Sequence, residues 1–101
     1  MSNVLHANSQ EFQDIISNNE TVLVDFFANW CGPCKMLSPS IEKLADEHDE
    51  IKVVKIDVDQ EQSLAMQFQV QSIPTVIVFK NGQPVNRQLG FMPYEALEGM
   101  L

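Results

Sequence analysis

The sequence predicts an α/β fold with a central mixed β-sheet flanked by helices on both faces. Apolar strand patterns alternate with helical patterns up to Lys80, which favours parallel pairing of successive strands. The dipeptide Asn81-Gly82 then joins two strand patterns, which predicts an antiparallel hairpin. At 101 residues the chain has room for one core, so we expect residues 1–101 to form a single domain.

The first half of the chain contains two predicted strands and two predicted helices. Val4-Leu5 is a short strand, and Ser9 is the N-cap of a helix that runs to about Ser17. Thr21 to Ala28 is a nearly continuous apolar run, typical of a strand that is buried on both faces. Residues 34–48 are helical, because apolar side chains recur on one face at spacings of three and four: Met36, Leu37, Ile41, Leu44 and Ala45.

The second half contains a strand, a short helix, the hairpin and a last helix. Pro39 lies inside the helix predicted for residues 34–48 and is expected to kink it, since proline lacks the N–H that the helix needs. Pro93 is expected at the first position of the last helix. The predicted bounds are 51–58 for the strand, 62–68 for the helix, 75–80 and 84–89 for the hairpin, and 93–101 for the last helix. The order is therefore β-α-β-α-β-α-β-β-α, with Phe12, Phe26, Phe68, Phe79, Met36 and Met66 expected in the core.

Charge and hydropathy argue against several classes of partner. Six basic and 14 acidic residues give a net charge of −8, which disfavours nucleic acid and anionic membranes. No stretch approaches the roughly 20 apolar residues that cross a bilayer. The N-terminus lacks the basic region and apolar core of a secretory signal, so we expect a cytoplasmic protein, with a monomer as the default state.

Cys31 and Cys34 are the only cysteines, and they lie where the buried strand passes into a helix. Two thiols at such a junction form a dithiol that can close and open a disulfide. The alternatives are a zinc half-site and an inert pair. Zinc takes four ligands, and only His6 and His48 could assist, neither at a finger-like spacing. We therefore expect no metal and no bound cofactor.

A series of short motifs runs in order along the chain from about Phe12 to Leu97: Val24-Asp25-Phe26, Trp30-Cys31-Gly32-Pro33-Cys34-Lys35, Pro39, Lys55-Ile56-Asp57, Ser72-Ile73-Pro74-Thr75, Phe79-Lys80-Asn81-Gly82 and Gly90. Each is weakly specific alone, but together, at this spacing, they resemble the thioredoxin family. The resemblance implies a thioredoxin fold and a cytosolic protein-disulfide reductase. It also implies that NADPH-dependent thioredoxin reductase re-reduces the protein and that its substrates are disulfide-containing proteins. Such a protein is an electron donor in cell redox homeostasis.

The roles of the two cysteines follow from their places at the helix. Unpaired N–H groups and the helix dipole stabilise a Cys31 thiolate, so Cys31 is the expected nucleophile. Cys34, one turn further on, resolves the mixed disulfide. The resemblance implies that Gly32 and Pro33 tune the pair toward the disulfide form and hence toward a reductant. Related isomerases and oxidants carry a histidine in this insert, and this chain does not.

Asp25 is a lone acid in the middle of the apolar strand. Burial raises the pKa of a carboxyl group, and the resemblance places Asp25 beneath Cys34, where it exchanges a proton as a general acid and base. The alternative is an edge-strand acid that reaches solvent. Lys55 matches the lysine that pairs with this acid in the family and would tune Asp25; its alternative is an ordinary strand lysine.

An apolar rim is expected around Cys31 as the substrate-binding surface. By resemblance, the Ile73–Pro74 bond is cis and its loop packs against the dithiol, where the backbone of Ile73 could pair with an extended substrate. Without the resemblance, Pro74 is a plain turn proline, and Trp30 could be a core residue. The expected rim consists of Trp30, Gly32, Pro33, Ile73, Pro74, Gly90, Phe91 and Met92.

Some positions depart from the family pattern. Phe27 stands where many thioredoxins have a second tryptophan, and Phe91 is bulkier than the usual residue. The last helix is short and contains Gly99, which predicts modest stability at that end. A binding module without redox turnover and a dedicated oxidant or isomerase are the alternative functions; the Gly-Pro insert and the missing signal oppose the latter.

Overall fold

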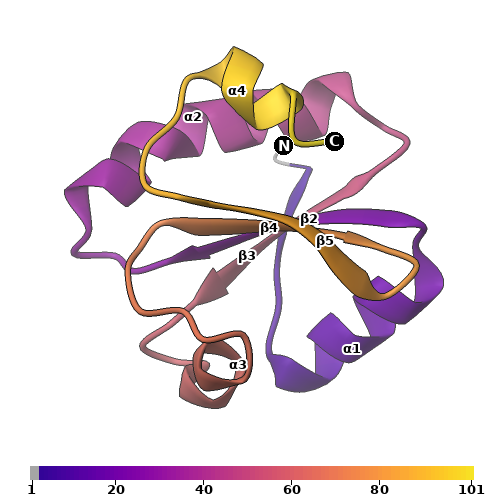
Figure 1. The fold of residues 1–101 in the computed structure, drawn as a ribbon, viewed down its shortest axis with the longest axis horizontal. Coiled ribbons are helices and arrows are strands. Elements are labelled where there is room, and N and C mark those ends of the chain that lie inside the picture. The colour runs from indigo at the N-terminus through magenta and orange to yellow at the C-terminus, as the bar shows by residue number, and fades with distance from the viewer. Residues whose placement is uncertain (1–2) are drawn as a thin grey trace.

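A mixed five-stranded β-sheet forms the middle layer of the computed structural model, which describes residues 3–101 (Figure 1). The strand order is β1-β3-β2-β4-β5. β1 and β2 both run parallel to β3, and β4 runs antiparallel to both β2 and β5. The bounds are β1 Val4–His6, β2 Thr21–Phe27, β3 Lys52–Asp57, β4 Thr75–Lys80 and β5 Gln83–Leu89. The predicted mixed sheet with its terminal hairpin is confirmed.

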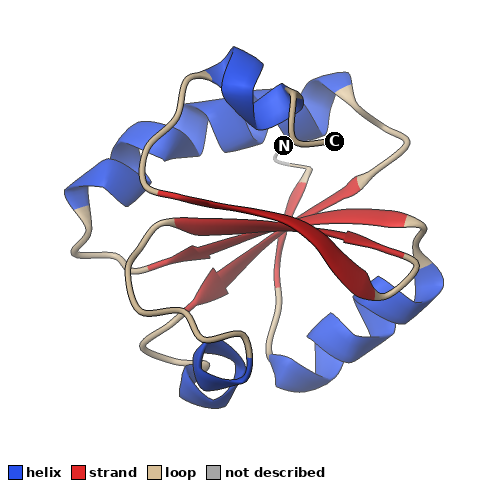
Figure 2. Ribbon diagram, in the orientation of Figure 1, coloured by secondary structure: helices blue, strands red, loops and turns tan. Residues whose placement is uncertain are grey.

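Helices cover both faces of this sheet, as the sequence predicts (Figure 2). α2 and α4 lie on one face, while α1 and α3 lie on the other (Figure 1). The bounds are α1 Ser9–Asn18, α2 Gly32–Glu47, α3 Gln62–Gln67 and α4 Tyr94–Glu98. The hairpin turn has positive φ angles at both central residues, 52° at Asn81 and 81° at Gly82, the conformation that this dipeptide favours.

Two apolar clusters fill the spaces between the sheet and its two helix layers. Leu37, Leu44 and Leu97 are fully buried on the side of α2 and α4. On the other side, the rings of Phe12 and Phe79 meet edge to face with centroids 5.5 Å apart. Phe68 is only half-buried and packs against this cluster from its edge. These clusters hold β2 in the centre of the molecule, with six of its seven residues buried.

The predicted burial of two methionines is wrong. The exposed fraction of the side chain is 63% for Met36 and 79% for Met66. The neighbouring Leu37 and Ala65 take the inward positions on their helices, and one residue along a helix turns the side chain by about 100°. Both methionines therefore face solvent.

Two predicted helix starts are also corrected. Asn8 caps α1, since its side chain accepts from the N–H of Glu11 and the carboxylate of Glu11 accepts from the N–H of Asn8. The hydroxyl of Ser9 instead donates to Glu61, 3.2 Å away. Pro93 precedes α4 as its N-cap, and α4 ends at Glu98 rather than Leu101, so Gly99 is a C-cap and not a residue within the helix.

Candidate active site

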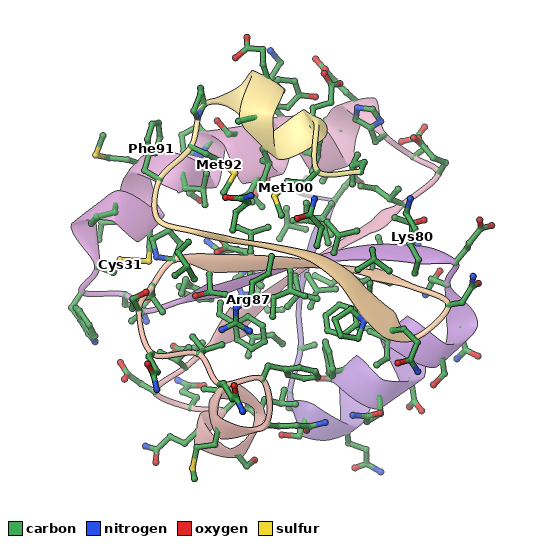
Figure 3. The ribbon with its side chains drawn as sticks, viewed as in Figure 1. Cys31, Lys80, Arg87, Phe91, Met92 and Met100 are labelled. Carbon is green, nitrogen blue, oxygen red and sulfur yellow. A yellow bond between two sulfur atoms is a disulfide. The ribbon has the colours of Figure 1, made fainter. Side chains whose placement is uncertain are left out.

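The two cysteines form a disulfide at the junction between β2 and α2. Cys31 is the N-cap of α2, Cys34 lies in its first turn, and their Cα atoms are 5.3 Å apart. The N–H of Cys34 donates to the Sγ atom of Cys31 over 3.1 Å. The disulfide lies at the edge of the molecule (Figure 3), although each of its two cysteines is at most 4% exposed. The helix start thus presents a backbone donor to the sulfur of Cys31.

The two residues between the cysteines are exposed. Gly32 and Pro33 form the first turn of α2, where backbone N–H groups have no partner within the helix. Pro33 lacks such an N–H, so it loses no helical hydrogen bond there. The insert therefore begins the helix directly after Cys31.

The loop before β4 packs against the disulfide. The Ile73–Pro74 bond is cis, as predicted, and the carbonyl oxygen of Ile73 lies 3.7 Å from the Sγ atom of Cys31. The carbonyl of Pro74 accepts from the N–H of Gly90 over 2.8 Å. Gly90 has a φ of +83°, a backbone conformation that favours glycine. This bond brings the segment after β5 beside the loop and the cysteines.

Of the larger rim residues, two are prominent on the surface and one is not. The exposed fraction is 70% for Trp30 and 47% for Phe91, so Trp30 is not a core residue. Met92 is only 7% exposed and belongs to the core cluster beneath α2 and α4, which also contains Met100 (Figure 3). Its predicted place in the rim is therefore wrong, because the chain turns inward directly after Phe91.

Asp59 is a partner of Trp30 that the sequence does not indicate. The indole N–H of Trp30 donates to Oδ2 of Asp59 over 2.8 Å. Asp59 follows β3, and no spacing in the sequence links it to Trp30. This bond orients an exposed ring beside the disulfide.

Asp25 is fully buried in the centre of the sheet. β2 lies between β3 and β4, which excludes the edge-strand alternative. Neither carboxyl oxygen of Asp25 has a hydrogen-bond partner among the residues that the structure describes. Burial raises the pKa of Asp25 to about 7, against a smaller lowering by the charge of Lys55.

Lys55 is half-buried and lies opposite Asp25 in the β2–β3 register. Its Nζ atom is 3.4 Å from Oγ of Ser38 and 4.4 Å from the ring centroid of Phe27. A cavity of about 270 Å³ lies here, lined by Phe27, Ala28, Asn29, Cys34, Lys35, Ser38 and Lys55. Nothing in the sequence indicates a role for Ser38, because a serine in a helix carries no signal of its partner on a strand.

Two kinds of site are absent from residues 3–101. No three or more histidine, cysteine, aspartate or glutamate side chains are placed to hold a metal ion there. None of the helices in that range combines the length and the apolar character that crossing a bilayer requires.

Comparison with known proteins agrees with this geometry. The family model described as "Thioredoxin" matches residues 3–101. A thioredoxin from Haemophilus influenzae is 44% identical over 103 residues, which cover 100% of this chain and 96% of that protein. A bifunctional thioredoxin reductase/thioredoxin from Mycobacterium leprae is 52% identical over 80 residues, 78% of this chain and 18% of that protein.

The solved structures lead to the same family. The structure of a mutant thioredoxin from Halobacterium salinarum superposes with a TM-score of 0.91 at 40% identity, covering 95% of this chain and 85% of that one. The architecture is therefore the thioredoxin fold, and the disulfide lies at the Cys-x-x-Cys spacing of the motif. The chain belongs to the thioredoxin family of protein-disulfide reductases.

Proposed function

We propose that, in this thiol-disulfide oxidoreductase, Cys31 attacks the substrate disulfide and Cys34 resolves the product. The Cys31 thiolate bonds to one substrate sulfur, and the other substrate sulfur leaves as a thiolate. The Cys34 thiolate then attacks the sulfur of Cys31, which releases the second substrate thiolate and leaves the Cys31–Cys34 disulfide. Two electrons pass to the substrate in each cycle.

The observation that carries this assignment is the N–H of Cys34 pointing at the Sγ atom of Cys31. A backbone donor at a helix N-terminus stabilises negative charge on the acceptor, which favours the thiolate. Exposure does not separate the two cysteines, since they are 4% and 3% exposed. What distinguishes Cys31 is its place at the N-cap. Cys34 lies further along the first turn of the helix, and its own N–H points toward Cys31.

Asp25 exchanges the proton of Cys34 in this proposal. A carboxyl group with a pKa of about 7 is present in both protonation states near neutral pH, as a general acid and base requires. It takes the proton of the Cys34 thiol when Cys34 attacks and returns it when the disulfide is reduced. Lys55 tunes this titration through its charge.

The proposed substrate-binding surface consists of Trp30, Ile73, Gly90 and Phe91, and the predicted rim residue Pro74 is buried, so that it supports this surface from within. Exposed aromatic rings beside a reactive group favour contact with a protein partner. We infer that the partners are disulfide-containing proteins and thioredoxin reductase. The Mycobacterium leprae relative, which combines the two names in one chain, supports the second partner. We further infer a cytoplasmic monomer in which residues 1–101 act as one domain, with no metal, nucleic-acid or membrane partner.

Two serine variants test the cysteine roles. With NADPH and thioredoxin reductase, we expect Cys31→Ser to abolish reduction of insulin disulfides. We expect Cys34→Ser to accumulate mixed disulfides with insulin, visible on a non-reducing gel, because the resolving thiol is missing. The double variant is the matched control and should trap nothing. Trapping by Cys31→Ser but not by Cys34→Ser would reverse the assignment.

A reduction potential tests the direction of electron flow. The pair is equilibrated in glutathione buffers and followed by the fluorescence of Trp30. A potential near the value of about −270 mV that is typical of thioredoxins supports a reductant. A value of about −180 to −120 mV would instead indicate an isomerase or oxidant.

A further inference from the structure

Ser38 lies one helical turn after Cys34, and both side chains line the same cavity of about 270 Å³. The hydroxyl of Ser38 accepts a hydrogen bond from Nζ of Lys55 over 3.4 Å, and Lys55 lines the same cavity. Both residues are half-buried. Ser38 takes no part in the thiol-disulfide reaction itself. It nevertheless contacts Lys55, the lysine that is in register with Asp25.

The surroundings of Lys55 leave its ammonium group few partners. Within residues 3–101 it forms no ion pair, and its contacts are the hydroxyl of Ser38 and the face of Phe27. The ring attracts the cation through its quadrupole but offers no hydrogen-bond acceptor atom. The hydrogen bond to Ser38 is the directional contact.

We propose that Ser38 is a positioning residue, whose hydroxyl holds the Lys55 ammonium in the cavity beside Cys34 and keeps its charge acting on the buried carboxyl of Asp25. The proposal rests on the proposed function, in which Asp25 exchanges the proton of Cys34. In this role, Ser38 determines how strongly the charge of Lys55 opposes the effect of burial on the protonation of Asp25.

Few other charges compete with Lys55 around Asp25. From α2, the exposed Lys35 is the charged group at the cavity, since Cys34 is held in the disulfide and does not titrate. From β4, the residue in register with Asp25 is Val76, which carries no charge. Among residues 3–101, Lys55 is the one charged group that shifts the pKa of Asp25, and it lowers this pKa. The position of Lys55 therefore sets how far charge offsets the larger effect of burial on this carboxyl.

Loss of the Ser38 hydroxyl should weaken the electrostatic attraction between Lys55 and Asp25. Without Ser38 as acceptor, the ammonium gains hydrogen bonds only by turning toward water. Its attraction to Asp25 then falls, because the separation and the effective dielectric constant both rise. The protonated form of Asp25 becomes more favourable, so its titration midpoint moves to higher pH.

The test is a direct titration of the Asp25 side chain in the oxidised protein by carbon-detected NMR, without substrate. We expect the midpoint to rise by roughly half a pH unit in Ser38→Ala. Ser38→Thr keeps the hydroxyl and should restore the original midpoint. Ser40→Ala is the matched control, since it removes a half-buried hydroxyl from the same helix at a residue that does not line the cavity. An unchanged or lowered midpoint in Ser38→Ala would overturn the proposal.

A double variant shows whether Ser38 acts through Lys55. In a Lys55→Met background, Ser38→Ala should cause no further shift of the Asp25 midpoint. A shift of the same size as in the wild-type background would also overturn the proposal. Failure of the proposed function would be distinguished by a different measurement. Asp25→Asn would then turn over insulin at the wild-type rate, whatever effect Ser38 has on the titration midpoint of Asp25.

Discussion

Asp25 is the residue at which function and stability conflict most clearly. It is fully buried in the central strand, and neither of its carboxyl oxygens has a hydrogen-bond partner within residues 3–101. A charged carboxylate in such a place loses its hydration, and the charge of Lys55 compensates only in part. The fold holds this group because β2 is pinned by neighbours on both sides and by the cores on both faces of the sheet.

The first prediction is that Asp25→Asn stabilises the protein at pH 8 but not near pH 3. A solvated aspartate has a pKa of 3.8, whereas the pKa of Asp25 in the fold is about 7. As the pH rises between these values, the unfolded chain releases the proton and the folded protein keeps it, so stability falls until about pH 7 and stays low above it. The full effect is about 4 kcal/mol in the free energy of unfolding.

Urea denaturation at the two pH values measures this difference. The exposed Asp14 in α1 offers a matched control, because Asp14→Asn removes the same charge from a solvated position. If Asp25→Asn changed the stability equally at both pH values, titration of Asp25 would not be the cause.

A second prediction at this scale concerns the indole of Trp30. Asp59→Ala removes the acceptor of its N–H and leaves a 70% exposed ring free to reorient. We expect KM for insulin to rise two- to five-fold with little change in kcat, because an exposed hydrogen bond contributes about 1 kcal/mol or less. Steady-state kinetics of Asp59→Ala against the wild-type protein test this, and a loss confined to kcat would contradict it.

Residue-level contacts separate what the sequence can predict from what it cannot. The sequence shows Asp25 as an acid within an apolar strand, but it leaves open an edge-strand acid that reaches solvent, which only the strand order of the sheet excludes. The bonds from Trp30 to Asp59 and from Lys55 to Ser38 are not visible. They join residues from different elements, and their formation depends on side-chain reach after the elements have packed.

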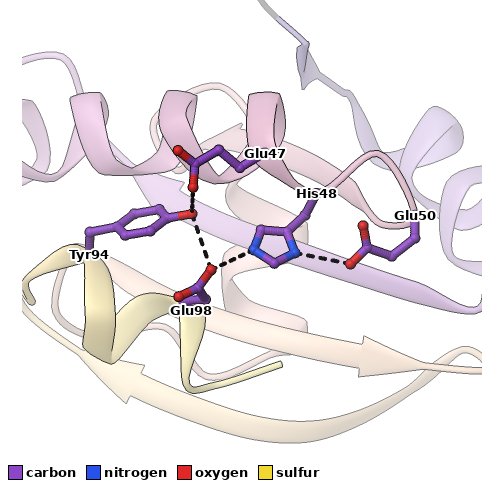
Figure 4. A network of polar contacts seen from close by, with 5 residues as sticks. All are labelled: Glu47, His48, Glu50, Tyr94 and Glu98. Atoms are coloured by element: carbon purple, nitrogen blue, oxygen red, sulfur yellow. Dashed lines mark hydrogen bonds and ion pairs between the residues drawn. The ribbon is translucent and has the colours of Figure 1, made fainter.

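At the scale of elements, a polar network fastens α4 to the end of α2 (Figure 4). The ring nitrogens of His48 lie 3.0 Å from Oε2 of Glu50 and 2.7 Å from Oε2 of Glu98. The hydroxyl of Tyr94 donates to Oε1 of Glu47 over 2.8 Å. A carboxylate only accepts hydrogen bonds, so both ring nitrogens of His48 must carry a proton to bond in this way, which is the charged imidazolium.

The third prediction is that α4 loosens as the pH rises. Hydrogen bonds to Glu50 and Glu98 raise the pKa of His48 above its usual 6.5. The stabilisation is therefore fully present below about pH 6.5 and is lost as the pH rises through the raised value. Amide exchange at Leu97, corrected for its intrinsic pH dependence, should accelerate roughly two- to five-fold across this window.

The matched control for α4 is the other histidine. His48→Gln should remove the pH dependence, while His6→Gln, at an exposed position in β1, should keep it. Constant protection of Leu97 across the window in the wild-type protein would contradict the role of His48. The same measurement tests the modest stability expected for this end of the chain.

The boundary of an element can be predicted from the sequence where a pattern repeats along the element. The prediction fails where a single side chain determines the boundary. All five strands are found within one residue of their predicted bounds, because alternation and apolar runs extend over the whole strand. The start of α1 depends on whether Asn8 or Ser9 accepts from the free N–H groups of the first turn. Asn8 does so, while the hydroxyl of Ser9 donates to Glu61. Met36 and Met66 fit an apolar face by type, but neighbouring residues occupy the buried positions.

At the scale of the whole molecule, the sheet topology explains how distant motifs reach one site. β2 leads directly into Cys31, the turn before β4 brings Ile73 to that sulfur, and the segment after β5 brings Gly90 to Pro74. The sequence predicts this arrangement because the alternation of elements and the Asn81-Gly82 turn leave few ways to pair the strands. It could not predict the inward turn that buries Met92.

The whole fold also couples the disulfide to stability. The disulfide closes a loop between residues three apart in the sequence. Restriction of the unfolded chain by so short a loop is worth about 2 kcal/mol in a chain-entropy estimate. The fourth prediction is therefore that the oxidised protein is more stable than the dithiol form by about this amount.

A thermodynamic cycle turns that difference into a reduction potential. If folding favours the disulfide by about 2 kcal/mol, the Cys31–Cys34 pair must be harder to reduce in the folded protein than in the unfolded chain, by about 40 mV for two electrons. Urea denaturation of both redox forms gives one side of the cycle, and glutathione equilibration with and without denaturing urea gives the other. The two sides must agree, and the double serine variant should match the dithiol form. A dithiol form as stable as the oxidised one would mean that folding leaves the potential unchanged, so that the reducing power would come from the local chemistry of the Gly32-Pro33 turn alone.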